Sequence, residues 1–256
     1  MARRSERTRQ LASRTVQIAF LLAVLLLWYL ATTFWGVNRL LLPNPVEVWE
    51  QLMEVLRSGN YLPDLRVTAT EFVVAFLLST TTGTVVGFFA SRSRFWTRVF
   101  EPLFAGIFSI PIILFLPLYV LFFGLGLESK IALGATISFF PIVLATIAGF
   151  SNVDRTLITA ARSMGASDWL LFRYVLLPAA LPVILGGLRI GFTICLLSIL
   201  GSETIASLAG LGHHIVELAE NMEMSRMFAY IAFVVVMVAL LNAVVSHLEA
   251  RGRRRG

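Results

Sequence analysis

Charged residues are scarce in this sequence, and their scarcity sets the class of the protein. Of the 256 residues, 14% are charged and 57% are apolar, and the mean hydropathy is +0.82. A soluble domain of this size could not remove that much apolar surface from water. The composition therefore excludes an ordinary soluble protein and predicts helices that lie in a lipid bilayer.

Cysteine and lysine are almost absent as well. Cys195 is the only cysteine and lies in an apolar run, so the chain has no internal disulfide and we interpret the thiol as a small packing group. Lys130 is the only lysine, and it does not end a glycine-rich phosphate-binding motif. We therefore expect this chain not to bind ATP and not to be an enzyme.

A metal centre is not predicted either. The adjacent His213 and His214 are followed by Met222 and Met224. Neighbouring histidines on a helix point in different directions, and no cysteine or carboxylate cluster completes a coordination shell. We expect no metal and no cofactor in this chain.

Six apolar runs are long enough, at about 1.5 Å per residue, to cross a hydrocarbon core about 30 Å thick. We predict an all-α membrane protein with six transmembrane helices in one domain, residues 15–250, flanked by basic tails at 1–14 and 251–256. The first run is long for a signal peptide and lacks a small-x-small cleavage site, so we expect it to stay attached. The predicted spans are 15–35, 67–90, 102–123, 131–150, 179–201 and 227–247.

Basic residues are distributed unevenly between the two sides of this predicted bundle. With six spans both termini share a side, and that side holds 15 of the 21 basic residues, counting the tails and the loops around Arg92 and Asp154. The positive-inside rule then places both termini and the loop at 154–178 in the cytoplasm. The predicted location is a membrane that the chain crosses several times.

An amphipathic helix is predicted between the first two spans. Asn44 and Glu47 have capping-box spacing, Pro45 suits the first helical position, and Gly59 suits the C-terminal cap. Its apolar stripe would consist of Val46, Trp49, Met53 and Leu56. We expect this helix to lie on the outer surface of the bundle.

The interval 154–178 is polar and carries strong local signals for two short helices. Asp154 is a candidate N-cap for a first helix that ends near Met164. Gly165 can then adopt the left-handed conformation, and Ser167 can cap a second helix over 168–176. Pro178 stops that helix or begins the next one. The interval is either a docking element or a bent loop between membrane helices.

The same interval resembles the "EAA" cytoplasmic loop of permease subunits of binding-protein-dependent ABC importers. The match consists of Ala160 and Ala161, then Gly165, then Leu177 and Pro178 at the family's spacing, while Thr159 stands where the family has Glu. A salt bridge from Thr159 to an ATPase is therefore not expected. Other stretches resemble the nitrate, sulfonate and taurine branch of that family: LLPNPVEVW, SIPIILFLPLYVLFFGLGLESK, LPAALPVILGGLRIG and GLGHHI.

The resemblance implies a type I importer fold, a location in a bacterial inner membrane, a function and a set of partners. It implies two permease copies, expected as a homodimer, with two cytoplasmic subunits that bind ATP and magnesium and an external solute-binding protein. The permease would form the path for a small solute, expected to be a sulfonate, nitrate or similar anion. The residues implied in coupling to the ATPase are Thr159, Ala160, Ala161, Gly165, Ala166, Ser167, Leu177 and Pro178.

Ionisable groups at membrane depth are costly, so each is a candidate for the translocation path or its gate. We favour Glu203, beside Ser202 at the end of the fifth span, although it could instead cap a short helix or face external water. Arg189 could meet an anion, or pair with a carboxylate, or extend to the headgroups. Glu71 is expected in a solvated position. Pro111, which breaks a helical hydrogen bond, and Gly212, in a predicted outer gate, complete the set.

Three other functions remain to be weighed. Ala161, Gly165 and Leu171 fall at spacings like those of a DNA-binding helix-turn-helix, but flanking spans leave no room for a separate domain, so no nucleic acid is expected. An ion-coupled secondary transporter or channel would show inverted repeats or a chain of buried acids, and the sequence shows neither. A membrane enzyme would need a cluster of nucleophile, base or metal ligands.

Overall fold

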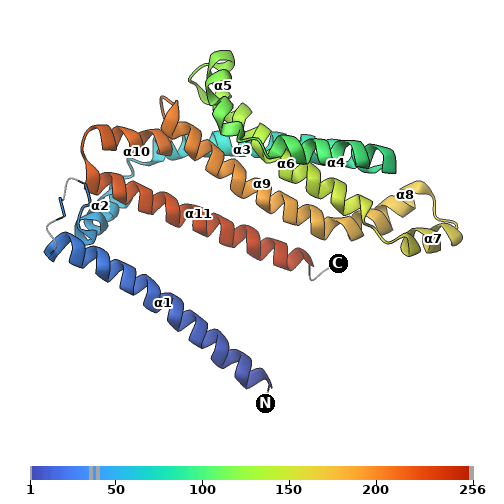
Figure 1. The fold of residues 1–256 in the computed structure, drawn as a ribbon, viewed down its shortest axis with the longest axis horizontal. Helices are drawn as coiled ribbons and strands as arrows, with labels where there is room; N and C mark the ends of the chain where they lie inside the picture. The colour runs from blue at the N-terminus through green and yellow to red at the C-terminus, as the bar shows by residue number, and fades with distance from the viewer. Residues whose placement is uncertain (1, 35–36, 39–40, 254–256) are drawn as a thin grey trace. The chain divides into compact units, whose positions relative to one another are not determined.

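The computed structural model describes residues 2–34, 37–38 and 41–253, with side chains described over 15–247 of that set. The described backbone is helical and contains no strand. Figure 1 shows the chain order of the helices. Their bounds are α1 Ala2–Phe34, α2 Pro45–Ser58, α3 Leu62–Ser91, α4 Arg94–Phe108, η1 Ile112–Phe115, α5 Leu116–Phe123, α6 Leu127–Ser151, α7 Arg155–Ser163, α8 Asp168–Leu171, η2 Phe172–Leu176, α9 Leu177–Ile205, α10 Leu211–Glu220 and α11 Met224–Arg253.

The chain divides into two compact units. One unit holds the residues up to Tyr61 together with Ile215–Val235, and the other holds Leu62–His214 together with the residues from Val236 onward. The residues of each unit pack mainly against other residues of the same unit. The candidate site residues predicted from the sequence all lie in the second unit.

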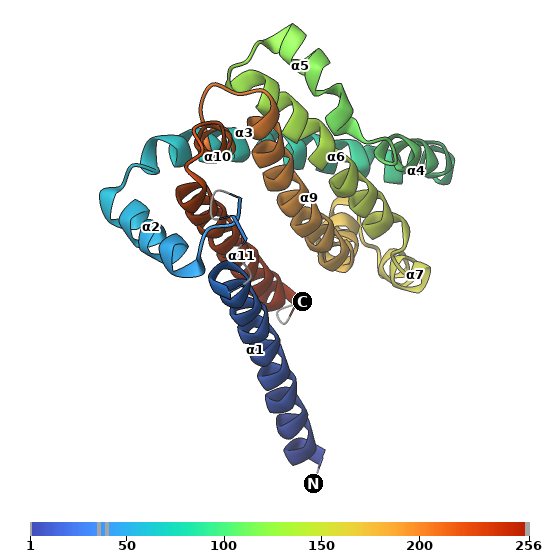
Figure 2. The ribbon, with the colours of Figure 1, turned by 60° about the vertical axis from the view of Figure 1, so that its left-hand side comes forward.

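Helix α6 is the centre of the second unit, where it packs along both α3 and α9 and also contacts α4 and α5 (Figures 1 and 2). Small residues make these contacts close. A Cβ on Gly87 of α3 would lie 2.6 Å from the Cβ of Thr146 on α6, and one on Gly191 of α9 would lie 2.7 Å from Ile142 of α6. Packing of this kind holds helices together in lipid, where the hydrophobic effect between them is weak.

Within the part of the chain that the structure describes, five helices are long and apolar enough to cross a membrane, and a sixth span results if the bent pair α4 and η1–α5 is one crossing. The predicted third span is therefore not one helix. It begins at Arg94 rather than residue 102, and its two parts are bent by 72°. Pro111 is the residue directly before η1. Proline has no N–H to donate to the preceding turn, so a helix tends to be interrupted at this position.

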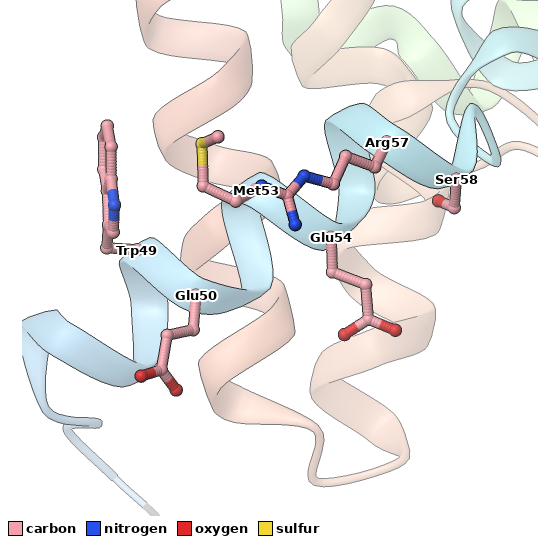
Figure 3. Close-up of a pocket in the computed structure, with 6 residues that line it drawn as sticks. All are labelled: Trp49, Glu50, Met53, Glu54, Arg57 and Ser58. Carbon is pink, nitrogen blue, oxygen red and sulfur yellow. The ribbon is translucent and has the colours of Figure 1, made fainter.

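In the first unit, the ends of α2 are confirmed and its apolar face differs from expectation. Asn44 accepts a 2.9 Å hydrogen bond from the Val46 amide, and Gly59 has a φ of 69°. The buried side chains are Val48 and Val55, while most of the predicted stripe is exposed. Figure 3 shows the residues that line one pocket, all of which come from α2: Trp49, Glu50, Met53, Glu54, Arg57 and Ser58.

Some predictions concern residues outside the described set. Trp35, the predicted end of the first span, is not described, and neither are the side chains of both basic tails. The backbone of α1 begins at Ala2, and its apolar part runs from Thr15 to Phe34.

Candidate functional site

The corner between α7 and α8 has the caps that the sequence predicts. The Asp154 carboxylate accepts a 2.8 Å hydrogen bond from the Thr156 amide at the start of α7. That bond favours the charged form, so it lowers the pKa of Asp154 below its usual value. At the start of α8, the Ser167 hydroxyl accepts from the Leu170 amide at 3.4 Å. Local capping therefore fixes both ends of the corner.

The end of α7 closes on Gly165, whose φ of 82° lies in the left-handed region that favours glycine. The Ala166 amide donates to the Ala161 carbonyl at 3.0 Å and the Gly165 amide donates to the Arg162 carbonyl at 3.0 Å. This pair of bonds is the Schellman closure of a helix. An exposed ion pair between Arg162 and Asp168, at 3.2 Å, links α7 to α8.

The second helix of the corner does not end where the sequence suggests. It continues from Asp168 through a π-helical turn at Phe172–Leu176 into α9, so one helical segment reaches Ile205. Pro178 follows the π-helical turn and stands near the start of α9. The fifth span therefore begins before residue 179.

The predicted coupling residues divide into exposed and covered ones. Ala161 is 6% exposed and packs within its own chain, whereas Ala160 is exposed. The corner also has exposed large apolar side chains, which are Leu157 at 51%, Met164 at 81%, Trp169 at 68% and Leu170 at 45%. Four of the other coupling candidates are exposed, namely Thr159, Gly165, Ser167 and Pro178. The remaining two, Ala166 and Leu177, are half-buried.

A second candidate site lies at the other end of α6, where α9 ends and α10 begins. Glu203 of α9 is 1% exposed, and its carboxylate accepts from the Thr68 hydroxyl and from the Gly212 amide, each at 2.7 Å. Thr68 in turn accepts from the Leu211 amide at 3.0 Å. Glu203 thus caps α10, which is one of the alternatives the sequence left open.

The expectation that Glu71 is solvated is wrong. Its side chain is 1% exposed and its carboxyl lies beside that of Glu203. Lys130, which the sequence places at the end of a loop, is fully buried near both carboxyls and donates to the carbonyls of Leu125 and, at 3.0 Å, Gly126. The site therefore joins α3, α6 and α9 through ionisable groups.

Not every predicted path residue reaches this cluster. Ser202 is buried next to Glu203, but its hydroxyl donates to the Ile199 carbonyl of its own helix. Arg189 lies on an exposed face of α9, four turns before Glu203 by sequence, and Pro111 is exposed at the bend after α4. The structure brings together Glu203, Ser202 and Gly212 and leaves Arg189 and Pro111 apart.

The residues that sequence reasoning missed are Thr68, Glu71 and Lys130. The available signal was a charge at the beginning of an apolar run, with Thr68 one turn before Glu71 on the same helix face. His213 and His214 are half-buried, and the described residues hold no group of three or more His, Cys, Asp or Glu side chains arranged to bind a metal.

Comparisons with known proteins agree over most of the chain. The family described as "Binding-protein-dependent transport system inner membrane component" matches residues 79–254. The taurine transport system permease protein TauC of Escherichia coli (strain K12) is 30% identical over 242 residues, 93% of this chain and 88% of that protein. The putative aliphatic sulfonates transport permease protein SsuC of Bacillus subtilis (strain 168) is 28% identical over 228 residues, 89% and 83% respectively.

The likeness extends to solved structures. A chain of the inward-facing MetNI methionine ABC transporter matches with a TM-score of 0.61 at 21% identity, over 73% of this chain and 93% of that one. A chain of an amino acid ABC transporter crystallised with histidines matches with a TM-score of 0.63 at 20% identity, over 80% and 98%. At these identities the likeness establishes a shared fold.

Proposed function

Since the chain belongs to the family of inner membrane components of binding-protein-dependent transport systems, we propose that it is the path-forming permease of an ATP-driven importer for a sulfonate or a similar small anion. The predicted fold class, a type I importer permease, is confirmed by the two structural matches. The proposal for the solute rests on the taurine and sulfonate relatives.

Partner subunits would supply the ATP-binding site and the solute-binding protein that an importer needs. The sequence contains no ATP-binding motif, so two cytoplasmic subunits would bind ATP and magnesium and hydrolyse the nucleotide. A second copy of the chain would complete the bundle, and an external solute-binding protein would deliver the solute. Both termini would face the cytoplasm of a bacterial cell, as the distribution of basic residues favours.

The ATPase would dock on the corner of α7 and α8. The observation that carries this assignment is the exposure of Leu157 and Met164, which lie between the apolar spans Leu127–Ser151 and Asp168–Ile205. Apolar side chains left uncovered on a rigid, well-capped corner are typical of a surface that a partner covers. Ala160 on α7 has almost no side chain, so a partner could approach its backbone.

Motion of this corner would reach the bundle through α6 and α9. The corner connects to α6 through residues 152–154 and continues without a break into α9. Nucleotide and loaded binding protein would each favour one state of a bundle with two conformations, which is how two distant sites are coupled. The permease itself contributes no chemical step.

The test is co-purification of the ATPase with an Ala160→Trp variant in mild detergent. Ala160 is exposed, so the new side chain fits the free permease and interferes only with a partner. We expect loss of the bound ATPase and of solute-stimulated ATP hydrolysis. Ala161 is unsuitable for this test because it is buried, and a large side chain there would disturb the permease itself.

The control is Asn60→Trp, which places the same bulk at an exposed residue far along the chain from the corner. It should leave ATPase binding and stimulated hydrolysis at the level of the natural chain. If Ala160→Trp binds the ATPase and couples as well as this control does, the corner is not the docking surface.

A further inference from the structure

Two carboxyl groups lie side by side in the buried cluster, and only one of them receives hydrogen bonds from ordinary donors. Glu203 accepts from the Thr68 hydroxyl and the Gly212 amide. Glu71 contributes a buried oxygen, Oε2, that has no hydrogen-bond partner. Ionised carboxylates only accept hydrogen bonds, so two of them cannot bond to each other. A proton on one of them turns this contact into a hydrogen bond.

The charges of the cluster point to the same conclusion. With both carboxyls ionised, the fully buried Lys130 would balance only one of two negative charges. An unbalanced buried charge is costly, and adjacent carboxyls avoid the cost by retaining a proton. Glu203 is the better anion, because it has two donors and caps the positive end of α10.

We propose that Glu71 is a proton-binding site, in which a neutral carboxylic acid donates to the Glu203 carboxylate, and that this acid pair holds the first turn of α10 (Leu211–His214) against α3 and α9. The proton is a fixed part of the fold at this end of the bundle. Glu203 positions the first turn of α10, and Glu71 supports Glu203 by donating a hydrogen bond to its carboxylate.

The surrounding charges leave this assignment intact. On α3, Asp64 accepts from the Gly210 amide at 3.1 Å, and its other oxygen lies 3.9 Å from Nδ1 of His214 on α10. On α6, Glu128 is exposed and lies near Lys130. None of these groups donates to Oε2 of Glu71.

Close packing explains why glycines surround Glu203. A Cβ on Gly212 would lie 2.7 Å from the Cβ of Glu203, and a Cβ on Gly210 would overlap its carboxylate. The backbone of the α9–α10 connection is therefore in direct contact with the acid. If the first turn of α10 moves away from α9, the Glu203–Gly212 hydrogen bond must break.

The first experiment detects the proton directly. Infrared spectra of the reconstituted transporter at neutral pH should contain a carbonyl band of a protonated carboxylic acid. That band should disappear in Glu71→Gln, whose amide has the same shape, and should persist in Glu101→Gln, which changes an exposed acid on α4. A natural protein without the band, or a Glu71→Gln variant that keeps it, would overturn the proposal.

The second experiment measures whether Glu203 positions α10. Hydrogen exchange by mass spectrometry reports the protection of the Leu211 and Gly212 amides, which donate to Thr68 and Glu203. Glu203→Gln replaces one carboxylate oxygen, which accepts a hydrogen bond, with an NH2 group, which can only donate. One buried donor then has no acceptor, so exchange in this segment should accelerate roughly tenfold or more. Glu71→Gln should leave exchange unchanged, and acceleration equal to that in Glu203→Gln would contradict the assigned roles.

The third measurement separates a fixed proton from a transported one. Glu71→Gln can donate to Glu203 but cannot release a proton, so ATP-driven solute uptake should continue at the natural rate. Loss of uptake in a variant that still assembles with its ATPase would show that the proton leaves during the cycle. That result would overturn the fixed proton while leaving the importer function in place.

Discussion

Substitution of two adjacent glycines on α9 should have opposite effects on stability. A Cβ on Gly187 would overlap the Cβ of Ala145 on α6 and lie 3.1 Å from the Pro141 carbonyl, whereas a Cβ on Gly186 would have no atom within 4 Å. The atoms that Gly187→Ala would meet belong to the backbone or are fixed to it. They cannot rotate away, so α9 must move from α6.

The size of the difference follows from two effects. Alanine stabilises a helix by about 1 kcal/mol relative to glycine, which benefits both variants. Overpacking costs about 1–3 kcal/mol, and it applies only to Gly187→Ala. At roughly 2–4 °C per kcal/mol for a chain of this size, the unfolding midpoints of the two variants should differ by several degrees.

The assay uses the natural thiol as its reporter. Cys195 is fully buried, so a thiol-reactive fluorophore labels it only when heating opens the bundle. The midpoint should fall in Gly187→Ala and stay level or rise in Gly186→Ala, in the same detergent. Equal midpoints for both variants would show that α9 does not contact α6 at Gly187 in the protein.

Two further predictions concern the corner. Gly165 has a φ of 82°, which asparagine tolerates, and a Cβ at this position would have no atom within 4 Å. The Gly165→Asn variant should therefore fold normally yet weaken ATPase coupling. Normal coupling would mean that no partner approaches this residue. The pKa of Asp154 is lowered on folding, so its stabilisation of α7 is present at neutral pH and is lost as the pH falls through the folded value. The protection factor of the Thr156 amide, which corrects its exchange rate for the intrinsic effect of pH, should therefore fall in acid in the natural chain and stay constant over this pH range in Asp154→Asn, and an unchanged pH response in the variant would refute the cap.

Local signals made the corner predictable. Asp154, Gly165 and Ser167 act within three or five residues of themselves, so their roles as caps and turn can be read from sequence spacing. The same holds for Asn44 and Gly59 around α2. Which side of such a helix is covered depends on distant residues, and there the sequence was a poor guide, as the burial of Ala161 illustrates.

The buried cluster was only half predictable for the same reason. Glu203 was expected to matter because it is an acid at the end of an apolar run. The burial of Glu71 and Lys130 depends on the meeting of α3, α6 and α9, whose residues lie far apart in the sequence. The position of the bend after α4 follows from Pro111, whereas its 72° angle depends on packing against α6.

Helix α6 joins the two ends of its unit. From Lys130 to Ser151 it rises about 30 Å, the thickness of a hydrocarbon core. Glycines of α3 and α9 lie against it so closely that sliding would require the helices to separate. We therefore expect α3, α6 and α9 to move together as one rigid body. A displacement of these helices at one membrane surface would then produce a displacement of similar size at the opposite surface.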